Sequence, residues 1–117
     1  MKRKTIRNHR DFFVPSTELM AADDCFLIKA KPAKIQNDAR YGIIVSKKTF
    51  KLAVQRNRAK RLIRDWVAFN EHLMDADLDY IFIPHYAILD VNREDGRKKM
   101  EKSFKKIAKI CKENAQK

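Results

Sequence analysis

Glycine, proline and cysteine are all scarce in this chain. Its 117 residues include two glycines, three prolines and two cysteines. A phosphate-binding loop needs several closely spaced glycines. The two glycines of this chain, Gly42 and Gly96, are far apart in the sequence, so we expect no such loop. No paired cysteine spacing suggests a disulfide framework or a zinc site, so we expect Cys25 and Cys111 to be reduced thiols in the core.

Long apolar runs are also missing. No stretch approaches the roughly 20 apolar residues of a membrane-spanning helix. The basic N-terminus MKRKTIRNHR is followed by no hydrophobic segment of the kind that a signal peptide needs. We therefore expect a cytoplasmic protein that does not act at a membrane.

The sequence proposes no catalytic or metal-binding group. The histidines at 9, 72 and 85 have no spacing typical of metal ligands. The acids between Asp75 and Asp79 are better explained as a helix end followed by a turn. We expect no catalytic residue and no metal site, which favours a binding protein over a protein catalyst.

Positive charge is what the chain has in excess. It carries 27 lysines and arginines against 15 acids, a formal net charge of +12, and 44% of its residues are apolar. The size and apolar content predict one folded domain over residues 1–117, with 1–8 as a mobile basic lead-in. Such a charge imbalance favours nucleic acid as the partner.

The basic residues are densest between Lys47 and Arg64, where no acid occurs. The segment holds eight cations: Lys47, Lys48, Lys51, Arg56, Arg58, Lys60, Arg61 and Arg64. Like charges one helical turn apart repel each other. A bound polyanion would neutralise these cations and offset their repulsion, so the cluster predicts a polyanionic partner.

Hydrophobic periodicity predicts an α+β sandwich, with helices packed on a small mixed sheet. We expect strands at 25–31, 40–46 and 79–84. Before the first strand we expect a helical turn at 9–14 and a second short stretch at 18–22. A long helix should run from a Thr49 cap to about Met74, and a closing helix should cover 97–113.

The long helix is expected to have two faces. Its apolar stripe runs from Ala59 to Leu73, with Asn70 as the exception. At about 100° per residue, the opposite arc holds Arg56, Asn57, Lys60, Arg61 and Arg64, while Arg58 points to a third side.

Two other sets of residues leave alternatives open. The closing helix has a lysine face that is most simply a solvated surface, although its field would attract a polyanion. Phe12, Phe13 and Phe26 could stack on unpaired bases or belong to the core. Trp66 and Phe104 are expected in the core.

The stretch YGIIVSKKTFKLAVQRNRAKRLIRDW resembles the signature of the protein subunit of bacterial ribonuclease P. Ser46-Lys47-Lys48 match its strand end, and Arg56, Asn57, Arg58, Lys60, Arg61 and Arg64 match its basic helix motif. The expected order of elements, with three helices, agrees with that family. The resemblance implies a fold like the second domain of ribosomal protein S5 and a left-handed βαβ crossover. It also implies that these residues, with Lys47 and Lys48, bind a catalytic RNA.

The resemblance further implies that the RNA uses Mg²⁺ to remove the 5′ leader of precursor tRNA, and that the protein alone is not a nuclease. Phe12 and Lys29 would line the cleft for the leader. Pro15-Ser16 replace the family's continued first helix, so either the leader cleft has a different shape or Phe13 stands in for a second aromatic.

A rival from another class is a stand-alone nucleic-acid module, such as a ribosomal or DNA-binding protein. It shares the charge argument and needs no catalytic RNA. We favour the ribonuclease P subunit, with RNA and not DNA as its partner.

Overall fold

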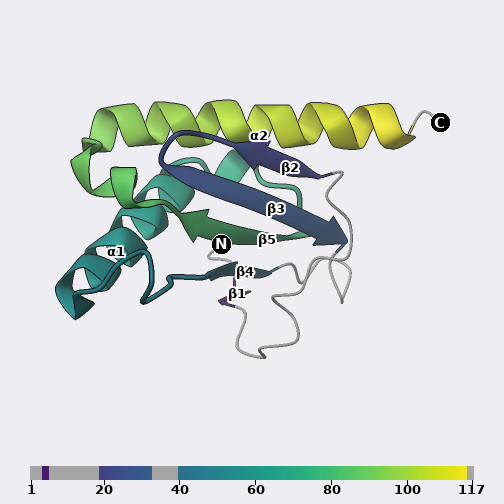
Figure 1. The fold of residues 1–117 in the computed structure, drawn as a ribbon. Coiled ribbons are helices and arrows are strands. Elements are labelled where there is room, and N and C mark those ends of the chain that lie inside the picture. The colour runs from purple at the N-terminus through teal and green to yellow at the C-terminus, as the bar shows by residue number, and fades with distance from the viewer. Residues whose placement is uncertain (1–3, 6–18, 33–39, 116–117) are drawn as a thin grey trace.

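The computed structural model of the protein describes residues 4–5, 19–32 and 40–115. These residues form one mixed sheet with two α-helices packed on it (Figure 1). The strands are β1 (Lys4–Thr5), β2 (Met20–Ala22), β3 (Phe26–Pro32), β4 (Arg40–Ile43) and β5 (Leu78–Pro84). The helices are α1 (Ala53–Phe69) and α2 (Arg93–Ala115), with short 3₁₀ helices η2 (Glu71–Leu73) and η3 (Tyr86–Asp90).

The predicted α+β class and mixed sheet are confirmed. The helical turn expected around His9–Val14, which would be the third helix, lies outside the described residues. The short stretch expected at 18–22 contains strand β2, which the sequence did not identify as a strand. Within the expected basic lead-in, Lys4–Thr5 form β1 beside β4, and the other residues lie outside the described ones.

The sheet has the spatial order β1-β4-β5-β3-β2. β3 is antiparallel to both β2 and β5, whereas β4 is parallel to β5. Since α1 lies between β4 and β5 in the sequence, these three elements form a crossover between neighbouring parallel strands (Figure 1). Helix α1 is therefore connected on both sides to inner strands of the sheet, β4 before it and β5 after it.

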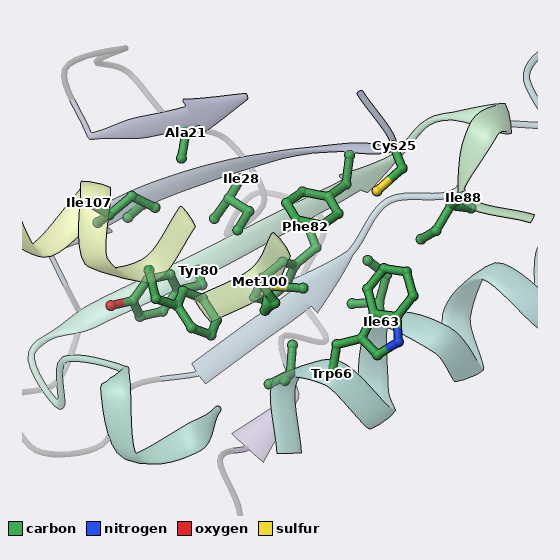
Figure 2. Packing of buried hydrophobic residues seen from close by; sticks show 14 of the residues in the cluster. Ala21, Cys25, Ile28, Ile63, Trp66, Tyr80, Phe82, Ile88, Met100 and Ile107 are labelled. Carbon is green, nitrogen blue, oxygen red and sulfur yellow. The ribbon is translucent and has the colours of Figure 1, made fainter. Parts of the chain in front are cut away.

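The hydrophobic core fills the space between the sheet and the two helices. Alternate residues of β3 are buried, with Phe26, Ile28 and Ala30 on one face, as expected for a strand. Ile28 pairs with Phe82 of β5, and Figure 2 shows labelled side chains from the sheet and from both helices in the layer between them. Trp66 is fully buried, which confirms its predicted core position.

Aromatic rings make up much of this core. Phe104 of α2 meets the rings of Tyr80 and Phe82 at centroid distances of 5.4 and 6.0 Å, which confirms that it is a core residue. Phe26 lies 6.2 Å from Trp66 and is fully buried. The alternative that Phe26 stacks on nucleic-acid bases is therefore wrong.

Helix α1 is shorter than predicted at both ends. The backbone of Ser46–Phe50 forms a turn in which Ser46 Oγ accepts a hydrogen bond from Lys48 N (3.0 Å). This local hydrogen bond competes with helix formation, so the helix begins at Ala53 after Leu52, not after Thr49. It ends at Phe69, and residues 71–73 form η2 instead of continuing to Met74.

Asn70, the polar exception in the predicted stripe, joins the two helices. It is 1% exposed, and its amide Nδ2 donates to the carbonyls of Trp66 and Arg97, both at 3.0 Å. Both carbonyls are thus satisfied where α1 ends against the start of α2. A buried amide that makes two hydrogen bonds is stabilising, which explains a polar residue at this core position.

Helix α2 begins at Arg93, four residues before the predicted Arg97. Asn92 Oδ1 accepts a hydrogen bond from Asp95 N (2.8 Å), so Asn92 acts as the N-cap and the helix starts directly after it. Gly96 lies within the helix and against the Trp66 ring, where a Cβ atom would collide with the indole carbons. Glycine at this position lets the two helices approach each other closely.

Candidate nucleic-acid interface

The candidate interface begins in the turn before α1. Lys47 and Lys48 are both exposed in the Ser46–Phe50 turn. Phe50, fully buried, fixes the end of this turn in the core, and its N–H donates to the carbonyl of Ser46 (2.9 Å). A buried aromatic residue thus anchors a short loop that displays two lysines.

Helix α1 then presents five polar or basic side chains away from its core side. We call this set the basic arc: Arg56, Asn57, Lys60, Arg61 and Arg64. Asn57, Arg61 and Arg64 are exposed, and Arg56 and Lys60 are half-buried at the edge of the arc. The opposite side of the helix buries Ala59, Ile63, Trp66 and Val67. The arrangement predicted from the 3.6-residue period is therefore present.

No carboxylate neutralises the basic arc within the described part of the chain. The acid nearest to it in sequence, Asp65, accepts from Arg97 Nη2 (3.1 Å) and lies 3.9 Å from Arg93 Nε. Arg56 Nη1 donates to two carbonyls, those of Phe50 (2.8 Å) and Lys51 (3.1 Å). These neutral acceptors fix the position of the guanidinium group but do not neutralise its charge. The first turn of α1 also carries no acid. The positive end of the helix dipole therefore adds to the field of the arc.

Arg58 lies apart from the arc, as predicted. Its Nη2 donates to the carbonyl of Leu89 in the 3₁₀ helix η3 (3.3 Å). Beside it, a shallow hollow of about 360 Å³ lies between α1 and the start of α2, lined by Arg58, Arg61, Leu62, Asp65 and Arg93. Arg93 joins this region only because α2 packs on α1, so sequence spacing could not have indicated it.

The residues expected to line a leader cleft are only partly described. Lys29 is half-buried on β3, in register with Met20 on one side and Ile81 on the other. It alternates with Ile28 and Ala30, so it lies on the sheet face opposite the helices. Phe12 and Phe13 lie outside the described residues.

Lys51 is a further cation of the basic segment 47–64 that was not among the predicted site residues. It is exposed between Phe50 and the N-cap Leu52, and its carbonyl accepts from Arg56. Its position just after the turn that carries Lys47 and Lys48 could have indicated it.

The remaining reactive groups are structural. Burial and the hydrogen bond to Asp23 raise the pKa of the Cys25 thiol to about 12, so it stays protonated at neutral pH. Both cysteines are free thiols. In the described ranges there is no cluster of three or more histidine, cysteine or acidic side chains that could hold a metal ion. Among those same residues, neither helix is long and apolar enough to cross a membrane.

The family model described as Ribonuclease P matches residues 1–108 of the chain. The chain belongs to the ribonuclease P protein family. It is 37% identical over 97 residues to the ribonuclease P protein component of Pseudoalteromonas translucida, an alignment that covers 83% of this chain and 68% of that protein. It is 38% identical over 85 residues to the component of a Marinomonas species, covering 72% of this chain and 62% of that protein.

The fold is also similar to that of the RNase P protein of Thermotoga maritima. The TM-score is 0.69 at 22% identity, with 89% of this chain and 97% of that chain covered. The resemblance inferred from the Ser-Lys-Lys and Arg-Asn-Arg motifs is confirmed, and the stand-alone nucleic-acid module is not favoured. Members of the ribonuclease P protein family are accessory subunits of a ribonucleoprotein endoribonuclease.

Proposed function

We propose that this protein is the protein subunit of ribonuclease P and binds the catalytic RNA through the basic arc of α1, together with Lys47, Lys48 and Arg58. The observation that carries the proposal is a row of cations that has no carboxylate partner within the described residues. Arginine offers a planar fork that matches phosphate oxygens, and Asn57 can bond to ribose or to base edges. Family membership makes a structured RNA the fitting polyanion.

The substrate of the assembly is, in this proposal, precursor tRNA in the cytoplasm. The 5′ leader would lie along the sheet face that carries Lys29, with Phe12 and Phe13 as its aromatic contacts. Mg²⁺ would be held by the RNA subunit and would supply the hydrolytic chemistry. The protein would position the leader and screen phosphate charge, so that less Mg²⁺ is needed.

The finer features of the fold belong to the same proposal. We expect a third helix from residues before β2, a left-handed β4–α1–β5 crossover, and the topology of the second domain of ribosomal protein S5. All of these would form one RNA-binding domain over residues 1–117.

Reconstitution tests the proposed function. The purified protein is added to a bacterial ribonuclease P RNA, and cleavage of precursor tRNA is measured at low Mg²⁺ against the RNA alone. We expect cleavage at the mature 5′ end to be stimulated, and the affinity for the RNA to fall steeply with salt because bound counterions are released. A protein that binds the RNA but never stimulates cleavage would contradict the subunit role.

A further inference from the structure

Tyr86 is an exposed aromatic residue that lies beside the first turn of α1. It begins η3 one residue after the end of β5, and the residue is 53% exposed. One face of its ring stacks on Phe50, with centroids 5.9 Å apart and planes inclined by 29°. Phe50 itself is fully buried. The ring of Tyr86 is thus the outer member of a stacked pair whose inner member belongs to the core.

Several contacts fix this ring in place. Its hydroxyl accepts a hydrogen bond from Gln55 Nε2 of α1 (3.2 Å). The rest of η3 is anchored because Ile88 is fully buried and the carbonyl of Leu89 accepts from Arg58. An immobilised ring loses little conformational entropy when a ligand stacks on it.

Two cations lie next to Phe50, the residue on which the Tyr86 ring stacks. Lys51 follows Phe50 in the chain, and Arg56 Nη1 donates to the carbonyls of both residues. Gln55, which donates to the Tyr86 hydroxyl, also accepts a hydrogen bond from the N–H of Leu52 (3.4 Å), and Leu52 is an apolar residue that is 58% exposed. An exposed aromatic face beside apolar surface and uncancelled cations fits a ligand that is both planar and anionic. An unpaired nucleotide has both properties, since its base stacks while its phosphate meets the cations.

We propose that Tyr86 is a stacking platform for an unpaired base of the RNA that binds the basic arc. The inference rests on the proposed function and adds a contact of a different physical kind. Phosphate contacts through the arc set the salt dependence, whereas stacking on a neutral ring adds affinity that salt barely changes. The first turn of α1 carries no acid, which favours a nucleic acid over a cationic protein segment as the occupant.

The test measures binding of a ribonuclease P RNA to four proteins over a range of salt: the wild type, Tyr86→Phe, Tyr86→Leu and Tyr86→Ala. Tyr86→Phe keeps the ring and should bind within about twofold of the wild type. Tyr86→Leu and Tyr86→Ala should bind roughly tenfold more weakly, with the slope of log affinity against log salt unchanged.

The leucine variant separates stacking from packing, because leucine can cover Phe50 but offers no π face. Wild-type affinity in the leucine or alanine variant would overturn the stacking proposal, and so would a reduced salt slope in either. Thermal unfolding of each variant shows whether a loss of binding reflects a loss of fold. If the wild type itself fails to bind the RNA, the proposed function fails, whereas stacking alone fails if the wild type binds and the variants match it.

Discussion

The two helices of this protein carry similar net positive charges, +4 on α1 and +5 on α2, but differ in how that charge is held. On α2, three lysines lie within ion-pair distance of acids: Lys98 with Glu94 (3.7 Å), Lys105 with Glu101 (3.0 Å) and Lys99 with Asp23 (3.2 Å). On α1, the basic arc has no such partner among the described residues. Charge density alone therefore does not identify a binding surface.

The residue types differ in the same direction. The exposed face of α2 is built from lysines, which are flexible and well hydrated. The arc of α1 combines three arginines with an asparagine and a lysine. Arginine holds a planar donor fork and is more weakly hydrated than lysine. The comparison suggests that α1 binds phosphate specifically, while α2 contributes mainly to long-range attraction.

The largest expected effect comes from removing charge from one helix and then from the other. Arg61→Ala combined with Arg64→Ala should weaken RNA binding about a hundredfold, because each charge-assisted hydrogen bond is worth about 1.5 kcal/mol or more. The salt slope should fall by about two units. Binding titrations at several salt concentrations provide the measurement.

The matched control is Lys102→Ala combined with Lys109→Ala on α2, where both side chains are exposed. It removes the same formal charge and should weaken binding only slightly. Equal losses from the two pairs would show that only net charge matters, and the distinction between the helices would be lost.

A second prediction concerns the contact that holds the helices together. Gly96→Ala places a methyl group against the Trp66 ring and should lower the free energy of unfolding by about 1–3 kcal/mol through overpacking. Urea unfolding followed by Trp66 fluorescence measures this loss. Ala108→Ser adds one heavy atom at an exposed position of the same helix and should change stability little; an equal loss there would argue against overpacking.

A third prediction separates arginine geometry from charge. Arg64→Lys keeps the charge of the arc but loses the planar fork, so affinity should fall a few-fold while the salt slope stays the same. The reciprocal change Lys109→Arg on α2 should leave affinity unchanged. If Arg64→Lys binds like the wild type, the arc acts only as a set of point charges.

The smallest effect is expected at the ion pair that ties α2 to the β2–β3 turn. Burial acts to raise the pKa of Asp23, but hydrogen bonds from Cys25 and Lys99 outweigh it, and the net shift is downward. A lowered native pKa means that the ion pair stabilises the fold above the unfolded value near 3.8 and that this stabilisation is lost as the pH falls through the native pKa.

Asp23→Asn should therefore cost up to about 1 kcal/mol of unfolding free energy at pH 7 and almost nothing at pH 2, since the pair is partly exposed. Urea unfolding of both proteins across this pH range gives the comparison. A constant difference at all pH values would show that the carboxylate charge is not what matters at this position.

Much of this architecture was predictable because it follows from periodicity. The 3.6-residue repeat identified the buried side of α1 and, on the opposite side, the arc from Arg56 to Arg64. The apolar run at 79–84 identified the central strand β5. Short-range patterns of this kind depend on the local chain alone, which is why they can be deduced from the sequence.

The predictions failed where a side-chain hydrogen bond, from a nearby or a distant residue, decides the structure instead of the hydrophobic repeat. The hydroxyl of Ser46 forms a turn that delays α1 until Ala53. Asn70 is buried because Arg97, 27 residues away, supplies a carbonyl for its amide. The stacking of the exposed Tyr86 ring on Phe50 likewise depends on how η3 packs against α1. The spacing of residues within either segment does not reveal this packing.

The crossover from β4 through α1 to β5 has a consequence for how the protein responds to its ligand. Because β4 and β5 pair with each other on either side of α1 in the chain, the helix that carries the basic arc belongs to the same folded unit as the sheet. A polyanion that binds only the folded chain must then raise its melting temperature, in proportion to the logarithm of ligand excess. The amide protons of β4 and β5, far from any phosphate, should exchange with solvent more slowly in the complex.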